Sequence, residues 1–190
     1  MQLMEQMIVE YGKIYPNNVL KVDSFLNHQV NINLLEDLAQ EIYRLYKDFE
    51  ITKILTIETS GIMLACFVAQ AFRVPMLFAK RIRGVKIKNN VHSAQVFSCA
   101  HDKDYTIYVD KDYLGSDDKV LLIDDFLANG YSMKGLVQLA QSADATVVGA
   151  AVAIEKGFQG GGDILRSLGL RIESMAIIES MGEDGIVFRQ

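Results

Sequence analysis

The chain of 190 residues has no tryptophan, only two cysteines and two prolines, and no excess of positive charge. Cys66 and Cys99 lie in apolar segments without metal-site spacing, so we expect buried thiols in a reducing compartment. The net charge of -5 argues against a general nucleic-acid binder, which normally carries a basic face. The longest clean apolar run, 147–154, is too short to cross a bilayer, and no basic stretch followed by an apolar one marks a signal peptide. We therefore expect a cytoplasmic protein with neither nucleic acid nor membrane as partner.

Strand-like and helix-like segments alternate along the chain, which predicts one α/β domain with a mainly parallel sheet flanked by helices. Asn33 is the predicted cap of the second helix, and segment 17–32 fits neither period. The basic segment 81–93 is predicted to be a flexible loop or hairpin arm, and 157–162 a flexible link. The expected strands are 53–58, 75–80, 94–99, 105–109, 120–124, 146–154, 171–177 and 186–189, and the expected helices are 1–15, 34–48, 62–72, 132–143 and 163–168.

The most informative segment is Val120-Leu-Leu-Ile-Asp124-Asp125-Phe-Leu-Ala-Asn129-Gly130-Tyr-Ser132. A continuous apolar run predicts a strand buried on both faces, and ligands bind beyond the carboxyl ends of such strands. Two adjacent carboxylates at that point repel each other, so hydroxyl groups or a divalent cation would compensate them. The small-residue loop before the next helix offers backbone amides that suit a phosphate, although a plain helix cap by Asn129 or Ser132 would fit the same residues. The pattern indicates a phosphorylated sugar as ligand.

Segment 120–132 resembles the phosphoribosyl-diphosphate signature of type I phosphoribosyltransferases, with Asn129-Gly130 where many members have Thr-Gly. Three further segments, 19–29, 56–62 and 154–159, are similar to bacterial xanthine phosphoribosyltransferases, and the similarity runs in order along essentially the whole chain. The resemblance implies the type I phosphoribosyltransferase fold for residues 1–190. In that fold a small hood, expected mainly from about 1–35 and the C-terminal part, stands beside the sheet together with a flexible loop.

For the phosphoribosyl donor, the resemblance implies that Asp124 and Asp125 bind the ribose hydroxyls and stabilise the sugar cation as diphosphate leaves. Mg²⁺ is expected mainly on the diphosphate, with no metal site built from protein ligands alone. The segment 81–93 is expected to close over the donor. The remaining donor contacts are expected from the phosphate loop Ala128, Asn129, Gly130, Tyr131 and Ser132, from the turn Thr59, Ser60 and Gly61, and from Lys80 and Arg81.

For the base, the resemblance implies that Lys156 bonds the purine 6-oxo group, while Leu20 packs on the purine and Asn27 bonds it. The expected reaction is transfer of the phosphoribosyl group to xanthine, giving xanthosine 5′-monophosphate and diphosphate in purine salvage. The preference for xanthine over guanine or hypoxanthine rests on the resemblance alone, and a non-catalytic purine-responsive regulator is the alternative from another class. Ala128 stands where the hypoxanthine-guanine branch has an acid, so the loop provides no general base. A homodimer is expected from the family.

Overall fold

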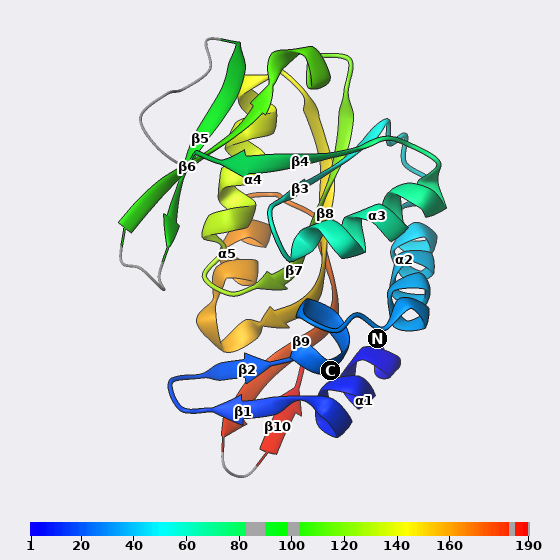
Figure 1. The fold of residues 1–190 in the computed structure, drawn as a ribbon, viewed down its shortest axis with the longest axis vertical. Coiled ribbons are helices and arrows are strands. Elements are labelled where there is room, and N and C mark those ends of the chain that lie inside the picture. Colours follow the sequence, from blue (N-terminus) through cyan, green and yellow to red (C-terminus); the bar gives the residue numbers. More distant parts are fainter. Residues whose placement is uncertain (83–89, 99–102, 183–184, 190) are drawn as a thin grey trace.

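The computed structural model describes residues 1–82, 90–98, 103–182 and 185–189, and an eight-stranded sheet runs through its centre (Figure 1). The strand order is β10-β9-β8-β7-β3-β4-β6-β5, and the five strands from β9 to β4 are parallel. Two antiparallel strands extend the β4 edge and one extends the β9 edge, so the predicted mainly parallel sheet is confirmed. The strands are β3 (Lys53–Ile57), β4 (Met76–Arg81), β5 (Val91–Ser98), β6 (Lys103–Asp110), β7 (Lys119–Leu127), β8 (Thr146–Lys156), β9 (Ile172–Gly182) and β10 (Gly185–Phe188).

Helices cover both faces of the sheet, which is why its central strands are apolar on both sides. Along β7, Leu121 and Ile123 pack with the helices α2 (Ile32–Tyr46) and α3 (Gly61–Phe72). The alternate residues Val120 and Leu122 pack with α4 (Tyr131–Ser142), where Leu165 of the short helix α5 (Gly161–Ser167) joins them. Period-two alternation along one strand thus divides the core into two apolar layers.

The N-terminal segment is more ordered than the sequence predicted. After α1 (Gln2–Tyr11), the strands β1 (Lys13–Tyr15) and β2 (Val19–Lys21) form an antiparallel hairpin, followed by a π-helical turn η1 (Asp23–Asn27). The prediction of an irregular segment over 17–32 was therefore wrong. The hairpin was hidden because its strands have three residues each, and its turn uses Asn17 and Asn18 at φ 63° and 59°, where asparagine replaces the expected glycine.

Several boundaries differ from the predictions for physical reasons. Helix α2 is capped by Asn31, whose side chain accepts from the amide of Leu34, and not by Asn33. Cys66 is exposed on α3 rather than buried, and Cys99 lies outside the described residues. The predicted flexible link 157–162 is a 3₁₀ turn η3 (Gly157–Gln159) that leads directly into α5. A further 3₁₀ turn, η2 (Lys111–Tyr113), follows β6, and residues 83–89 of the expected flexible loop lie outside the description.

Candidate active site

The acidic pair lies inside an extended strand end. The sequence predicted that β7 would end at Asp124, but it continues to Leu127 because Phe126 and Leu127 still pair with β8. On its other side β7 pairs with β3 only as far as Leu122, so the strand projects beyond its neighbour at the two aspartates. This projection leaves open space beside the pair, at the carboxyl end of the parallel sheet, where ligands of such folds bind.

Asp124 and Asp125 are each only 6% exposed, and the backbone amide of Asp125 donates to Oδ1 of Asp124 at 3.0 Å. Burial raises the pKa of Asp124 well above its ordinary value, and the neighbouring Asp125 carboxylate raises it further, while Arg81 acts weakly in the opposite direction. The charged form of this buried pair is unfavourable in free energy, and a ligand that brings hydrogen-bond donors or a cation would stabilise it. The pair is therefore electrostatically prepared for sugar hydroxyls, a metal ion or a developing positive charge.

The loop after β7 presents the N-terminus of α4. Gly130 is the N-cap residue at φ 83°, a backbone conformation that favours glycine, and it has no side chain that could cap the helix. The N-cap position is therefore occupied by Gly130 and not by Asn129 or Ser132, the two residues that the sequence offered for it. The first-turn amides and the helix dipole instead point into the region beyond β7, an arrangement that binds phosphate.

The turn between β3 and α3 closes the opposite side of the pair. Its residues Thr59, Ser60 and Gly61 follow a cis peptide bond between Glu58 and Thr59. A Cβ added to Gly61 would lie 2.8 Å from Oδ1 of Asp124, so only glycine lets this turn approach the carboxylate so closely. The turn predicted to contact diphosphate thus lies directly against the residue predicted to contact ribose.

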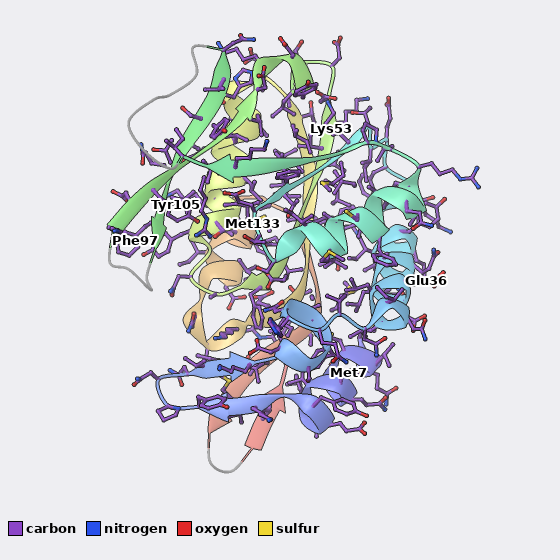
Figure 2. The ribbon with its side chains drawn as sticks, viewed as in Figure 1. Met7, Glu36, Lys53, Phe97, Tyr105 and Met133 are labelled. Atoms are coloured by element: carbon purple, nitrogen blue, oxygen red, sulfur yellow. The ribbon has the colours of Figure 1, made fainter. Side chains whose placement is uncertain are left out.

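Arg81 enters from β4 and is held by an aromatic ring. Its guanidinium lies 4.5 Å from the ring centroid of Tyr105, and its backbone amide donates to Glu58 at 2.8 Å. Figure 2 shows Tyr105 and Phe97 on the β5–β6 hairpin, on the side that faces the start of α4. The ring of Phe97 meets that of Tyr131 edge-on at 5.2 Å, so this hairpin and the phosphate loop pack together.

Lys156 stands at the end of β8. Its ammonium group donates to the backbone oxygen of Asn18 at 2.9 Å and lies 5.6 Å from the ring centroid of Phe126. Burial lowers the pKa of Lys156, because the buried ammonium group loses solvation. Leu20 is buried in the core beneath the hairpin, and Asn27 is exposed at the end of η1.

These elements enclose a cavity of about 740 Å³. The sequence-predicted residues that line it are Ser60, Arg81, Asp124, Asp125, Ala128, Asn129, Gly130, Tyr131, Ser132 and Lys156. Thr59, Gly61, Lys80, Leu20 and Asn27 are not among its lining residues. Sequence reasoning missed the contributions of Asn17, Asn18, Val19, Ile57, Glu58, Phe97, Tyr105, Phe126, Leu127, Met133 and Gln159.

Some of the missed residues carried a signal. Phe126 directly follows the acidic pair, and the Asn17-Asn18 pair is a turn signal that could have predicted the hairpin. Phe97 and Tyr105 come from strands on the sheet edge, and nothing local in the sequence places them near Asp124. Their position follows only from the antiparallel pairing of β6 with β4.

The fold and this site together indicate the class of protein to which the chain belongs. The sequence profile of the phosphoribosyl transferase domain matches residues 21–163. The chain belongs to the phosphoribosyl transferase family. Its curated relatives include xanthine phosphoribosyltransferases from several bacteria. The one from Lachnoclostridium phytofermentans is 49% identical over 100% of this chain and 98% of its own length, and the one from Clostridium novyi is 45% identical over 100% of both.

Solved structures show the same fold at greater distance. Adenine phosphoribosyltransferase from Giardia lamblia, solved with 9-deazaadenine, superposes with a TM-score of 0.77 at 24% identity, covering 93% of this chain and 98% of that one. The enzyme from Rhodothermus marinus gives a TM-score of 0.75 at 18% identity, covering 94% and 100%. At such low identity the likeness establishes the type I phosphoribosyltransferase fold and not the base that is used.

Proposed function

We propose that the chain transfers the 5-phosphoribosyl group from 5-phosphoribosyl 1-diphosphate to xanthine, giving xanthosine 5′-monophosphate and diphosphate. The observation that carries the proposal is that one cavity is lined by a buried acidic pair, by the N-terminus of α4 with its N-cap residue Gly130, and by a half-buried lysine. The choice of xanthine is supported by full-length relatives of that name at 43–49% identity.

The donor would bind across the sheet end. The amides of residues 128–132 would hold the 5′-phosphate, and Asp124 and Asp125 would accept from the ribose hydroxyls. Thr59, Ser60 and Gly61, with Lys80 and Arg81, would contact the diphosphate. Support for the last group comes from Gly61, which abuts Asp124, and from Arg81, whose guanidinium lines the same cavity.

A divalent cation fits this arrangement. The described part of the chain has no group of three or more His, Cys, Asp or Glu that could hold a metal by itself. Burial and the neighbouring Asp125 nevertheless raise the pKa of Asp124, and a cation or hydroxyl groups would stabilise its charged form. We propose that Mg²⁺ binds mainly through the donor diphosphate, where it would neutralise the charge of the leaving group.

In the reaction, the bond from C1′ of ribose to the diphosphate oxygen breaks, and a bond from purine N9 to C1′ forms. The carbon becomes positively charged as diphosphate leaves, and the carboxylates of Asp124 and Asp125 stabilise that charge more strongly than they stabilise the neutral sugar. Ala128 provides no general base, so the proton on xanthine would be lost without help from the phosphate loop.

For the base, we propose that Lys156 donates to the 6-oxo group, with Leu20 packing on the purine and Asn27 bonding it. This role is supported because Lys156 is one of the residues that line the cavity, and its ammonium group already donates to a carbonyl oxygen, that of Asn18. A buried ammonium group that keeps an oxo group as its acceptor loses little free energy. One that is left without a partner in a buried pocket costs ~1 to 3 kcal/mol. Such a pocket favours an oxopurine over adenine.

The larger organisation follows from the family. We propose a single domain over 1–190 in which residues 1–35 and the C-terminal part form the hood over the base.

We also propose a cytoplasmic homodimer. Large apolar side chains exposed on the N-terminal segment support an interface there, namely Val9, Tyr11, Ile14, Tyr15 and Val19. No helix in the described ranges is long and apolar enough to span a bilayer.

Turnover assays test the proposal directly. The purified protein is incubated with 5-phosphoribosyl 1-diphosphate and Mg²⁺ and, separately, with xanthine, guanine, hypoxanthine or adenine. We expect the highest kcat/KM with xanthine. A higher value with guanine or hypoxanthine would keep the chemistry and correct the base. Donor binding without turnover of any base would indicate a regulator instead.

A further inference from the structure

A fully buried carboxylate lies next to the proposed base-binding lysine. Glu155 of β8 is 0% exposed and precedes Lys156. Arg166 of α5 donates to both of its oxygens, from Nη1 to Oε1 at 2.8 Å and from Nη2 to Oε2 at 2.6 Å, and the hydroxyl of Ser174 also donates to Oε2. Both oxygens of Glu155 are thus engaged by donors from Arg166 and Ser174, so the side chain is fixed in a buried ion pair.

A buried ion pair is weak support for stability by itself, because desolvation offsets most of the attraction. The position of this pair suggests a different use. In the sheet, Glu155 is in register with Leu127, the last residue of β7 before the phosphate loop. Arg166 therefore ties α5 to the strand end from which that loop departs.

The first turn of α5 lies directly against the phosphate loop. The amide of Gly161 donates to the backbone oxygen of Ala128 at 3.1 Å, and a Cβ added to Gly161 would lie 2.3 Å from that same oxygen. A Cβ added to Gly162 would lie 2.0 Å from Oε1 of Glu155. The glycines thus let α5 fit between the buried carboxylate and the loop, with no side chain between them.

From these contacts we propose that Arg166 is a positioning residue for the 5′-phosphate site. By binding Glu155 it fixes α5, and α5 in turn fixes the loop 128–132 through the bond from Gly161 to Ala128. Arg166 does not line the cavity, so it acts on the loop and not on the ligand. The inference rests on the proposed function, because it assigns the loop to the ligand's phosphate.

The test compares two ligands that differ only in the 5′-phosphate, xanthosine 5′-monophosphate and xanthosine. The ratio of their dissociation constants measures what the phosphate contributes, and a general folding defect would weaken both equally. R166M alone would leave the Glu155 charge buried without a partner and destabilise the fold strongly. The double variant E155M/R166M removes both charges and keeps two side chains of similar length, so it is the variant to measure.

We expect E155M/R166M to reduce the preference for the monophosphate about tenfold, with xanthosine affinity close to that of the wild type. The matched control is R171M, which removes an arginine that pairs with Glu173 and stacks on Tyr46. Arg171 is near the opposite end of β8, since its backbone oxygen accepts from Ala150, six residues or roughly 20 Å from Lys156. This control should keep the wild-type preference while lowering the thermal midpoint.

An E155M/R166M protein that keeps the wild-type preference, or that loses affinity for both ligands equally, would overturn the positioning role. A wild-type protein that binds the monophosphate no better than xanthosine would instead contradict the proposed function, and with it the inference. The wild-type ratio is therefore measured first.

Discussion

Replacing Asp124 by asparagine should make the protein more stable and almost inactive. The substitution keeps the shape of the side chain and an oxygen that can accept from the amide of Asp125. What it removes is a charge on a residue that is only 6% exposed and has a like charge beside it. Strained or uncompensated groups of this kind are retained at sites where function needs them.

The effect should depend on pH in a defined direction. Burial and Asp125 raise the pKa of Asp124 in the folded protein above its unfolded value. The folded state therefore binds the proton more tightly, and the wild type loses stability as the pH rises from the unfolded pKa through the folded one. This single group contributes a slope of at most ~1.4 kcal/mol per pH unit within that window. The variant lacks this slope, so its advantage should be absent in acid and greatest at neutral pH.

At neutral pH we expect a gain of ~0.5 to 2 kcal/mol in the free energy of unfolding, typical for removal of a functional-site liability. For a chain of this size each kcal/mol corresponds to ~2 to 4 °C in Tm. Turnover should fall by ~100-fold or more, because the charge that stabilises the sugar cation is lost. Urea unfolding of both proteins across pH 4 to 8 measures the difference in their free energy of unfolding at each pH. This range begins near the ordinary carboxyl pKa values.

Asp117→Asn is the control, since it removes a carboxylate that is exposed on a turn and should leave the pH dependence of the wild type unchanged. The reasoning is refuted if Asp124→Asn is no more stable than the wild type at neutral pH, or if its advantage is the same at every pH.

Three further substitutions test other parts of the structure. Arg81→Ala should raise the KM for the donor by about tenfold, because a contact to the diphosphate is lost, and should leave the KM for the base nearly unchanged. Steady-state kinetics measures both values, and an unchanged donor KM would show that Arg81 does not contact the donor. Gly135→Ala should cost ~1 to 3 kcal/mol in urea unfolding, because the new Cβ would lie 2.4 Å from Cγ2 of Val96, and a variant as stable as the wild type would show that β5 can yield. Tyr46→Phe should cost about 1 kcal/mol, because the hydroxyl donates to the oxygen of Ala150 at 2.8 Å in the core, while kcat stays unchanged; a lower kcat would link the core to the site.

The sequence predicted the sheet and its helices well because strong apolar runs and helical periodicity determine those elements. Strand β7 shows where the prediction ended too early. Apolar character stops at Ile123, but backbone pairing with β8 continues through Leu127, and pairing does not depend on hydrophobicity. Asp124 was therefore placed correctly at the end of a strand, whereas Asp125 was placed beyond the strand although it lies within it.

Some residues of the candidate site could also be predicted from the sequence, and others could not, for physical reasons. The phosphate loop and acidic pair are contiguous in sequence, so one segment predicted both. Lys156, Arg81 and the turn at Gly61 were placed by resemblance, and the first two line the cavity in the structure. The close packing of Gly161 and Gly162 could not be predicted, because a run of three glycines usually indicates flexibility. Only the structure shows that Ala128 and Glu155 occupy the space that side chains at these two positions would need.

If Lys156 binds the base as we propose, its bond to the carbonyl of Asn18 would make base binding an exchange and not a simple addition. An entering oxopurine would have to replace an acceptor that the protein already supplies, so much of the favourable energy of the new bond would be offset by the bond that is given up. Such an exchange would keep the affinity for the base modest and would ease release of the nucleotide.

Adenine presents an amino donor at position 6 in place of the oxo acceptor, so it would not replace the carbonyl of Asn18 as the partner of Lys156. Exclusion of such a base then requires no clash, because the protein's own carbonyl outcompetes it for the ammonium group. The carbonyl of Asn18 in the hairpin turn would thus compete with each incoming base for the ammonium group of Lys156.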